Sequence, residues 1–351
     1  MNKGAIAAII VGGIALSLIT AFTVTAIVSA SNVKKDTKEF AINETVSNIK
    51  IDVDTTDIEF QLSENNERKV VCEQTTKDIH EVSVENEELL IKYFNRRNVF
   101  ERIFNFQQMK VTVFLPMASY SSLEIETDTG EIDVPYGYTF NSVKLKTDTG
   151  NISLKSSGIE QVSVRASTGN ITLSNINTKD FSVQASTGRL NLSKINASTK
   201  FFSKTSTGNQ VMEEVTTKEL ESQSSTGKIS FFSSQIENKG SFSTDTGGVE
   251  LKDTTMGELY AKASTGNIKL TNTIINGHAE LRTSTGDVIF EDSDAQTLYI
   301  KTSTGNIKGT FLTSKIFYVK QNSGSPNYPK STEGGLCEIY TDTGNINIKF
   351  K

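Results

Sequence analysis

A three-residue turn, spelled Asp-Thr-Gly or Ser-Thr-Gly, recurs along most of this chain of 351 residues. Its glycines follow one another at steps of 19 or 20 residues, and one of them, Gly324, has the different spelling Asn322-Ser323-Gly324. The twelve turn glycines are Gly130, Gly150, Gly169, Gly188, Gly208, Gly227, Gly247, Gly266, Gly286, Gly305, Gly324 and Gly344. A repeat of about 20 residues at fixed spacing is typical of a solenoid, in which each repeat forms one coil.

Apolar residues alternate with polar ones on both sides of each turn. Around Gly169 the alternating apolar positions are Val162, Val164, Ala166, Ile171 and Leu173. Alternation in steps of two indicates short strands with one buried face. The sequence therefore predicts an all-β fold, a right-handed parallel β-solenoid (β-helix) of about twelve coils of 19 to 20 residues, stacked about 4.8 Å apart.

Glycine suits the bend because it adopts positive φ at no steric cost. Asn, which also tolerates left-handed geometry, follows the glycine at positions 151, 170, 209, 267, 306 and 345. We expect stacked turns to align Thr hydroxyls and Asn amides in ladders along the rod.

The chain divides into three parts on this pattern. Residues 1–36 comprise an apolar segment and its flanks, residues 37–120 mostly lack the repeat, and residues 121–351 form the repeat domain. We interpret residues 37–120 as a cap, because an open solenoid end exposes unpaired strand edges. The cap includes a first, imperfect coil in which Thr56 replaces the glycine, and a hairpin of Val82 to Val84 with Leu89 to Tyr93.

The C-terminal end differs, since the chain stops at Lys351, soon after the turn at Gly344. No sequence remains to cover a coil at Gly344. Either Lys349 and Lys351 protect its edge by charge, or another molecule makes an end-to-end contact there. Cys337 falls on an inward position, so a disulfide with Cys72 is not expected.

The segment from Gly4 to Ala30 carries no charge and is rich in Ala, Ile and Val. Its 27 residues exceed the roughly 20 that span a bilayer. We expect one N-terminal transmembrane helix that acts as a signal-anchor, with the repeat domain extracellular and the protein a single-pass component of the cell membrane. A cleaved signal peptide is the alternative, because Val28-Ser29-Ala30 resembles a cleavage site.

Several motifs resemble catalytic or metal-binding sites, but their place in the repeat argues against such roles. Asp-Thr-Gly is the active-site spelling of aspartic proteases, but most equivalent turns carry Ser in place of Asp. Stacked Asp128 and Asp148 suggest calcium, yet two carboxylates rarely suffice. The only histidines, His80 and His278, are expected at the surface, and no catalytic, cofactor or metal residues are predicted. The net charge of −5 argues against nucleic acid as a partner.

One surface feature favours binding. Outward positions four and six residues before the glycines carry basic and aromatic side chains in four successive coils, those of Gly266, Gly286, Gly305 and Gly324. The predicted ligand-binding residues are Lys262, Arg282, Lys301, Lys320, Tyr260, Tyr299 and Tyr318, here called the strip. Lys and Arg pair phosphates or carboxylates, and Tyr faces stack on rings, so an anionic or sugar-containing polymer fits. The alternative is a solvated strand face whose long side chains cover apolar surface.

With turns such as Ser167-Thr168-Gly169-Asn170-Ile171, the chain resembles the bacterial membrane-anchored "putative adhesin" family, a domain of unknown function with β-strand repeats (LiaG-like). The resemblance covers about residues 49–351. It implies a bacterial envelope protein, with some members linked to envelope stress, and no catalytic residues.

The sequence therefore favours a non-enzymatic surface-binding module of the cell envelope, whose partner is an anionic cell-wall polymer or another envelope protein. Two alternatives stay open. One is a β-helix polysaccharide lyase or hydrolase, which needs acids gathered on one face. The other is a self-assembling, bactofilin-like scaffold that stacks through the C-terminal coil.

Overall fold

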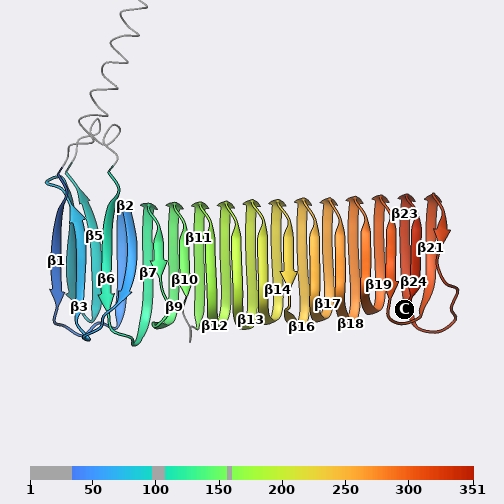
Figure 1. Ribbon diagram of the computed structural model, residues 1–351, viewed down its shortest axis with the longest axis horizontal. Helices are drawn as coiled ribbons and strands as arrows, with labels where there is room; N and C mark the ends of the chain where they lie inside the picture. The colour runs from blue at the N-terminus through green and yellow to red at the C-terminus, as the bar shows by residue number, and fades with distance from the viewer. Residues whose placement is uncertain (1–33, 97–106, 156–159) are drawn as a thin grey trace, which may run out of the picture.

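The structure is a computed structural model that describes residues 34–96, 107–155 and 160–351. Its strands form one continuous sheet, and Figure 1 shows them stacked into a straight rod with β1 at one end and β21 at the other. The strands are β1 (Asp36–Ile42), β2 (Asn48–Leu62), β3 (Arg68–Gln74), β4 (Asp78–Glu85), β5 (Glu88–Asn95), β6 (Met109–Leu115), β7 (Ser119–Thr129), β8 (Ile132–Val134), β9 (Thr139–Thr149), β10 (Ile152–Lys155), β11 (Gln161–Thr168), β12 (Ile171–Thr187), β13 (Leu190–Thr207), β14 (Gln210–Thr226), β15 (Ile229–Phe232), β16 (Gln235–Thr246), β17 (Val249–Thr265), β18 (Ile268–Thr285), β19 (Val288–Thr304), β20 (Ile307–Phe311), β21 (Lys315–Ser323), β22 (Pro326–Asn327), β23 (Gly335–Thr343) and β24 (Ile346–Phe350). The predicted all-β solenoid is confirmed.

The membrane span predicted for Gly4 to Ala30 lies outside the described residues. Within the part of the chain that the structure describes, no helix has the length and apolar character that a membrane crossing requires.

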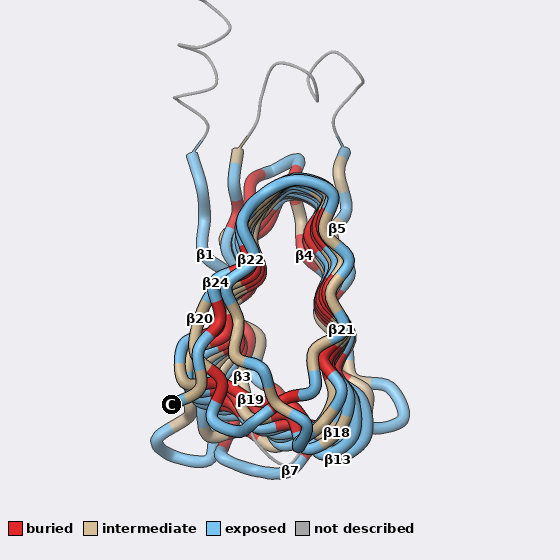
Figure 2. The backbone as a smooth tube through the Cα atoms, turned by 90° about the vertical axis from the view of Figure 1, so that its right-hand side faces the viewer, coloured by how far each residue is buried: buried red, intermediate tan, exposed pale blue. Residues whose placement is uncertain are grey.

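Each coil contains three strand segments whose inward side chains form the core. In the coil around Gly266 the buried side chains are, in order, Leu259, Ala261, Ala263, Ile268, Leu270, Thr273 and Ile275. Viewed along the rod, the coils superpose into an elongated loop with buried residues along its inner side (Figure 2). Some repeats have 20 residues and others 19. The additional residue of a 20-residue repeat lies at the corner that precedes the strand segment leading to the turn glycine, as between Ala197 and Lys200.

A second corner, which the sequence did not reveal, lies six residues after the turn glycine. The residue there has a φ between 47° and 57° at Asn175, Lys194, Glu214, Ser233, Asp253, Asn272 and Asp292. Left-handed geometry is tolerated best by Asn and Asp, but Lys, Glu and Ser also occupy this corner. The backbone conformation of this corner is therefore constant, while the residue type varies.

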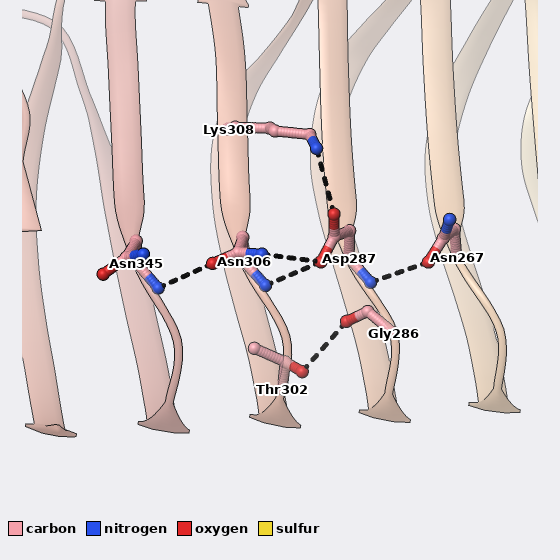
Figure 3. Close-up of polar contacts among 7 residues, drawn as sticks. All are labelled: Asn267, Gly286, Asp287, Thr302, Asn306, Lys308 and Asn345. Carbon is pink, nitrogen blue, oxygen red and sulfur yellow. Dashed lines mark hydrogen bonds and ion pairs between the residues drawn. The ribbon is translucent and has the colours of Figure 1, made fainter. Parts of the chain in front are cut away.

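The residue after the turn glycine forms the expected ladder. In the C-terminal coils its side-chain oxygen accepts a hydrogen bond from the backbone N–H of the next coil, and Figure 3 shows this through Asn267, Asp287, Asn306 and Asn345. Burial raises the pKa of Asp287, but hydrogen bonds from Asn306 and Lys308 outweigh it and hold the pKa below its ordinary value. The Thr302 hydroxyl donates to the carbonyl of Gly286 in the neighbouring coil, at 3.2 Å.

The N-terminal end of the rod is covered by antiparallel strands. In β2, Val53 lies beside Thr127 and Ile58 beside Ile132, so Thr56 stands where later coils have glycine. β4 and β5 form the expected hairpin, and β3 pairs antiparallel with both β1 and β6. β5 and β6 both run along β2, and so close this end of the core.

His80 lies inside this cap, so the expectation of a surface position was wrong for it. Its side chain is 1% exposed, and its Nε2 lies 3.1 Å from Oγ1 of Thr56. The β4–β5 hairpin directs this side chain toward the first coil. Its burial therefore depends on tertiary packing, which cannot be predicted from a single histidine in the sequence. His278 is exposed, as expected, and contacts Thr297.

We expect the free energy of unfolding to fall between pH 6.5 and pH 4 because of His80. Burial lowers the pKa of His80 to about 4, whereas the unfolded chain binds this proton near pH 6.5. The contribution is present above pH 6.5 and lost as the pH falls to 4, a change of about 3 kcal/mol. Urea unfolding of wild type and His80→Gln across this range measures it, and identical pH dependence in both proteins would contradict it.

The order of coils is reversed at the C-terminal end. β23 lies between β19 and β21, and β24 lies between β20 and β22. The coil of Gly344 is therefore enclosed, and the expectation that it ends the rod was wrong. The coil of Gly324 is outermost, as β21 in Figure 1 shows. The ring of Phe317 there packs near Phe311, Tyr328 and Phe350.

Candidate functional site

The strip lies on the outward face of the first strand segment in the C-terminal coils. β17 carries Tyr260 and Lys262, β18 carries Arg282, β19 carries Tyr299 and Lys301, and β21 carries Tyr318 and Lys320. Alternation along each strand turns these side chains outward, because their neighbours face the core. Parallel register then places Lys262, Arg282 and Lys301 side by side on successive coils.

The expected order of the strip was wrong at its end. Lys301 and Lys320 are not neighbours, because Tyr340 of β23 lies between them. In the adjoining row, Glu338 lies between Tyr299 and Tyr318. The reversed coil order thus adds the ring of Tyr340 and the carboxylate of Glu338 to the strip.

The rings of the strip form a short row. The ring centroids of Tyr299 and Tyr340 are 5.3 Å apart, and those of Tyr340 and Tyr318 are 6.1 Å apart. The guanidinium of Arg282 lies 4.8 Å from the Tyr299 centroid and also pairs with Glu280. Partial burial, the Glu338 carboxylate and the neighbouring rings raise the pKa of Tyr340. The row of rings begins beside the guanidinium of Arg282 and ends with Tyr318 on the outermost coil of the rod.

The ammonium groups of the strip differ in pairing from those near the N-terminal end. Among the ion pairs of the described residues, none involves Lys262, Lys301 or Lys320. On the same face in earlier coils, Lys144 pairs with Glu124 at 2.7 Å and Lys146 pairs with Glu126. The strip therefore presents free cations where Lys144 and Lys146 are neutralised, although Arg165 and Lys204 on the same face also belong to none of these ion pairs of the described residues.

The four aspartates of the turns lie on four different coils. Asp128 and Asp148 lie on adjacent coils, as expected, while Asp245 and Asp342 belong to distant ones. Burial raises the pKa of Asp128, and the carboxylates of Asp54 and Asp148 raise it further. Across the described residues, no group of three or more His, Cys, Asp or Glu side chains could hold a metal ion.

Tyr340 and Glu338 are the strip residues that sequence reasoning missed. Both occupy the right positions before Gly344, but the sequence does not say which coil lies beside which. Two signals marked the displaced coil: the altered turn at Gly324, and two prolines soon after it, Pro326 in β22 and Pro329 in the connection that follows β22. Proline is confined to edges and turns of sheets, which fits an outermost coil.

The fold and the strip define a β-solenoid repeat protein with an outward basic and aromatic face. The chain belongs to the Toastrack DUF4097 family, whose model matches residues 46–200 and 178–348. The match confirms the family resemblance seen in the turns. No curated protein matches the chain significantly.

Solved structures that match this chain share little sequence with it. A protein from Bacteroides fragilis described as a "putative adhesin" is 12% identical over 90% of this chain and 97% of its own, with a TM-score of 0.25. A protein from Parabacteroides distasonis described as a "putative lipid binding protein" is 13% identical over 91% and 98%, with a TM-score of 0.34. A "putative adhesin" from the same species is 12% identical over 79% and 98%, with a TM-score of 0.30.

Proposed function

We propose that this protein is a membrane-anchored, extracellular β-solenoid of the bacterial cell envelope that binds an anionic, sugar-containing wall polymer through the strip. The observation that carries the proposal is the combination of three unpaired ammonium groups with a row of tyrosine rings. Cations pair phosphates or carboxylates, and ring faces stack on sugars. A straight strip across stacked coils suits an extended polymer better than a small molecule.

The proposed role is binding and adhesion, without catalysis. A lyase or hydrolase needs acids and bases gathered at one point, and the turn aspartates lie on separate coils. The link to envelope stress rests on the family resemblance. Another envelope protein is the alternative partner for the same strip.

The proposed topology rests on the uncharged segment from Gly4 to Ala30, which precedes one long polar domain. We propose that it anchors the chain and leaves the rod outside the membrane. Protease treatment of intact cells tests this directly. Degradation of the rod only after lysis would contradict the proposed location.

Replacing Lys262, Arg282 and Lys301 with Gln is expected to weaken retention on purified anionic cell-wall polymer by at least about tenfold. Each exposed charge contact is worth about 0.5–1 kcal/mol, and 1.4 kcal/mol corresponds to a factor of ten. Wild-type retention should also fall with added salt, because surface charges are screened. Pull-down of the full chain on immobilised polymer measures both effects.

The matched control replaces Lys144 and Lys146 with Gln, on the same face but already paired with Glu124 and Glu126. Retention of this control should stay within about twofold of wild type, because each exposed pair contributes little. Unchanged retention of the triple variant would refute polymer binding by the strip. Equal losses in both variants would show general charge attraction and refute it as well.

A further inference from the structure

The outermost coil of the rod leaves one strand edge open. Among the strand pairings of the described residues, β21 has a single partner, β23. Alternate residues of a parallel strand bond to opposite sides, so about half of the nine residues of β21 direct their N–H and C=O groups away from the rod. Such an edge is a template for pairing with another strand.

Exposed apolar side chains gather at the same end. Four of the seven large apolar side chains that are exposed in the described residues lie here, namely Leu312, Ile316, Tyr318 and Leu336. The inward residues Phe317 and Val319 are half-buried, unlike their counterparts in inner coils. This end therefore combines open backbone groups with an unfinished apolar surface.

We infer that β21 pairs antiparallel with β21 of a second copy of this chain, so that two rods join end to end about a twofold axis at Val319. This register aligns all nine residues of both strands and sets Tyr318 opposite Lys320 of the second copy. Each ammonium then lies across from a ring, and the two Lys320 side chains do not face each other. A twofold pairing also puts residues of the same alternation opposite each other, so outward N–H groups meet outward C=O groups.

The other end of the rod favours this closed pair over a filament. Its outer strands, β1 and β4, carry charged, exposed side chains on their edges, including Lys38 and Glu39 in β1 and Glu81 and Glu85 in β4. Charged side chains are a common protection of an edge strand. β21 instead presents the exposed apolar side chains of Ile316 and Tyr318 beside one exposed lysine, Lys320. Among the strand edges that the structure describes, the open edge therefore matches its own copy better than it matches β1 or β4.

Disulfide cross-linking of the full chain in detergent micelles tests the pairing. Two β-strand residues directly opposite each other across an antiparallel pair have Cα atoms about 4.5–5.5 Å apart, within disulfide range. Val319→Cys should therefore cross-link to its own copy under mild oxidation and give a covalent dimer. The native thiols should not interfere, because burial raises the pKa of Cys72 and Cys337 to about 12.

Gln321→Cys is the matched control, since it lies on the same face of the same strand and is also half-buried. In the proposed register its two copies are separated by four residues, about 13 Å, and should not cross-link. Monomers with both variants would overturn the proposal. Cross-linking at 321 but not at 319 would overturn the register, and a ladder of longer oligomers in wild type would show a filament instead.

A second variant tests the pairing without cysteine chemistry. Ile316→Lys, at an exposed position outside the strip, places one more charge on the open edge of each copy, and should turn a wild-type dimer into a monomer in sedimentation measurements. Lys262→Gln, which lies on the strip but away from the edge, should leave the dimer intact. Because that change touches polymer binding alone, failure of the dimer and failure of the proposed function are distinguishable.

Discussion

Gly208→Ala is expected to cost at least about 4 kcal/mol of stability or to prevent folding, because the coils leave no room for a side chain at this turn. A Cβ on Gly208 would lie 1.9 Å from the carbonyl oxygen of Gly188 and 2.6 Å from its carbonyl carbon. Both are backbone atoms, so relief requires separating two hydrogen-bonded coils. The φ of 146° adds further strain for any other residue.

Two other glycines serve as comparisons. Gly277→Ala should cost no more than about 1 kcal/mol, because its nearest contact is 3.0 Å and its φ is not positive. Gly324→Ala should fall between the two, since its clash with Gly344 involves the outermost coil, which can move alone. Urea unfolding monitored by circular dichroism ranks the three. A Gly208 variant as stable as the Gly277 variant would refute the close-packing explanation.

The close approach of each turn glycine to a backbone carbonyl of the neighbouring coil explains why so much of the fold could be predicted from the sequence. Every coil repeats the same approach of a turn to the carbonyl below it, so glycine recurs at Gly150, Gly169 and the other turns at a fixed spacing. Positive φ, the reason for glycine that the sequence suggests, is the smaller part of the cause, and the backbone contact is the larger part. The second corner, six residues after each turn glycine, could not be predicted because many residue types occupy it, including Lys194 and Glu214. It therefore leaves no repeated residue in the sequence.

The candidate site was predictable in part for a related reason. Alternation along a strand determines which side chains point outward, and so placed Tyr299 and Lys301 correctly on the surface. Alternation does not determine which coil lies beside which. Gly305, Gly324 and Gly344 follow at regular steps in the sequence, yet the chain places the last coil between the other two. Tyr340 belongs to the strip because β23 lies between β19 and β21.

The outermost coil is held to the rod by a buried ion pair that the sequence did not suggest. Lys315, at the start of β21, is 2% exposed, and its Nζ lies 2.7 Å from Oδ1 of Asp294 in β19. The Thr313 hydroxyl donates to Oδ2 of Asp294 at 2.6 Å and accepts a hydrogen bond from Lys315 at 2.5 Å. The backbone N–H of Ala295 donates to Oδ1 of Asp294 at 2.9 Å. The pair therefore connects β21 to a strand that is not its neighbour.

Asp294→Ala is expected to cost about 3–5 kcal/mol, because it leaves the Lys315 ammonium buried without a countercharge. Replacing both partners, with Asp294→Leu and Lys315→Met, should recover most of that loss, since well-packed apolar residues often match a buried ion pair in stability. Urea unfolding gives the free energies, and limited proteolysis of the connection between residues 324 and 334 reports whether the outermost coil has come loose. The Asp294→Ala variant should be cleaved there faster than the double variant. A double variant as unstable as the single one would show that the polar network itself, and not the unpaired charge, secures β21 at the end of the rod.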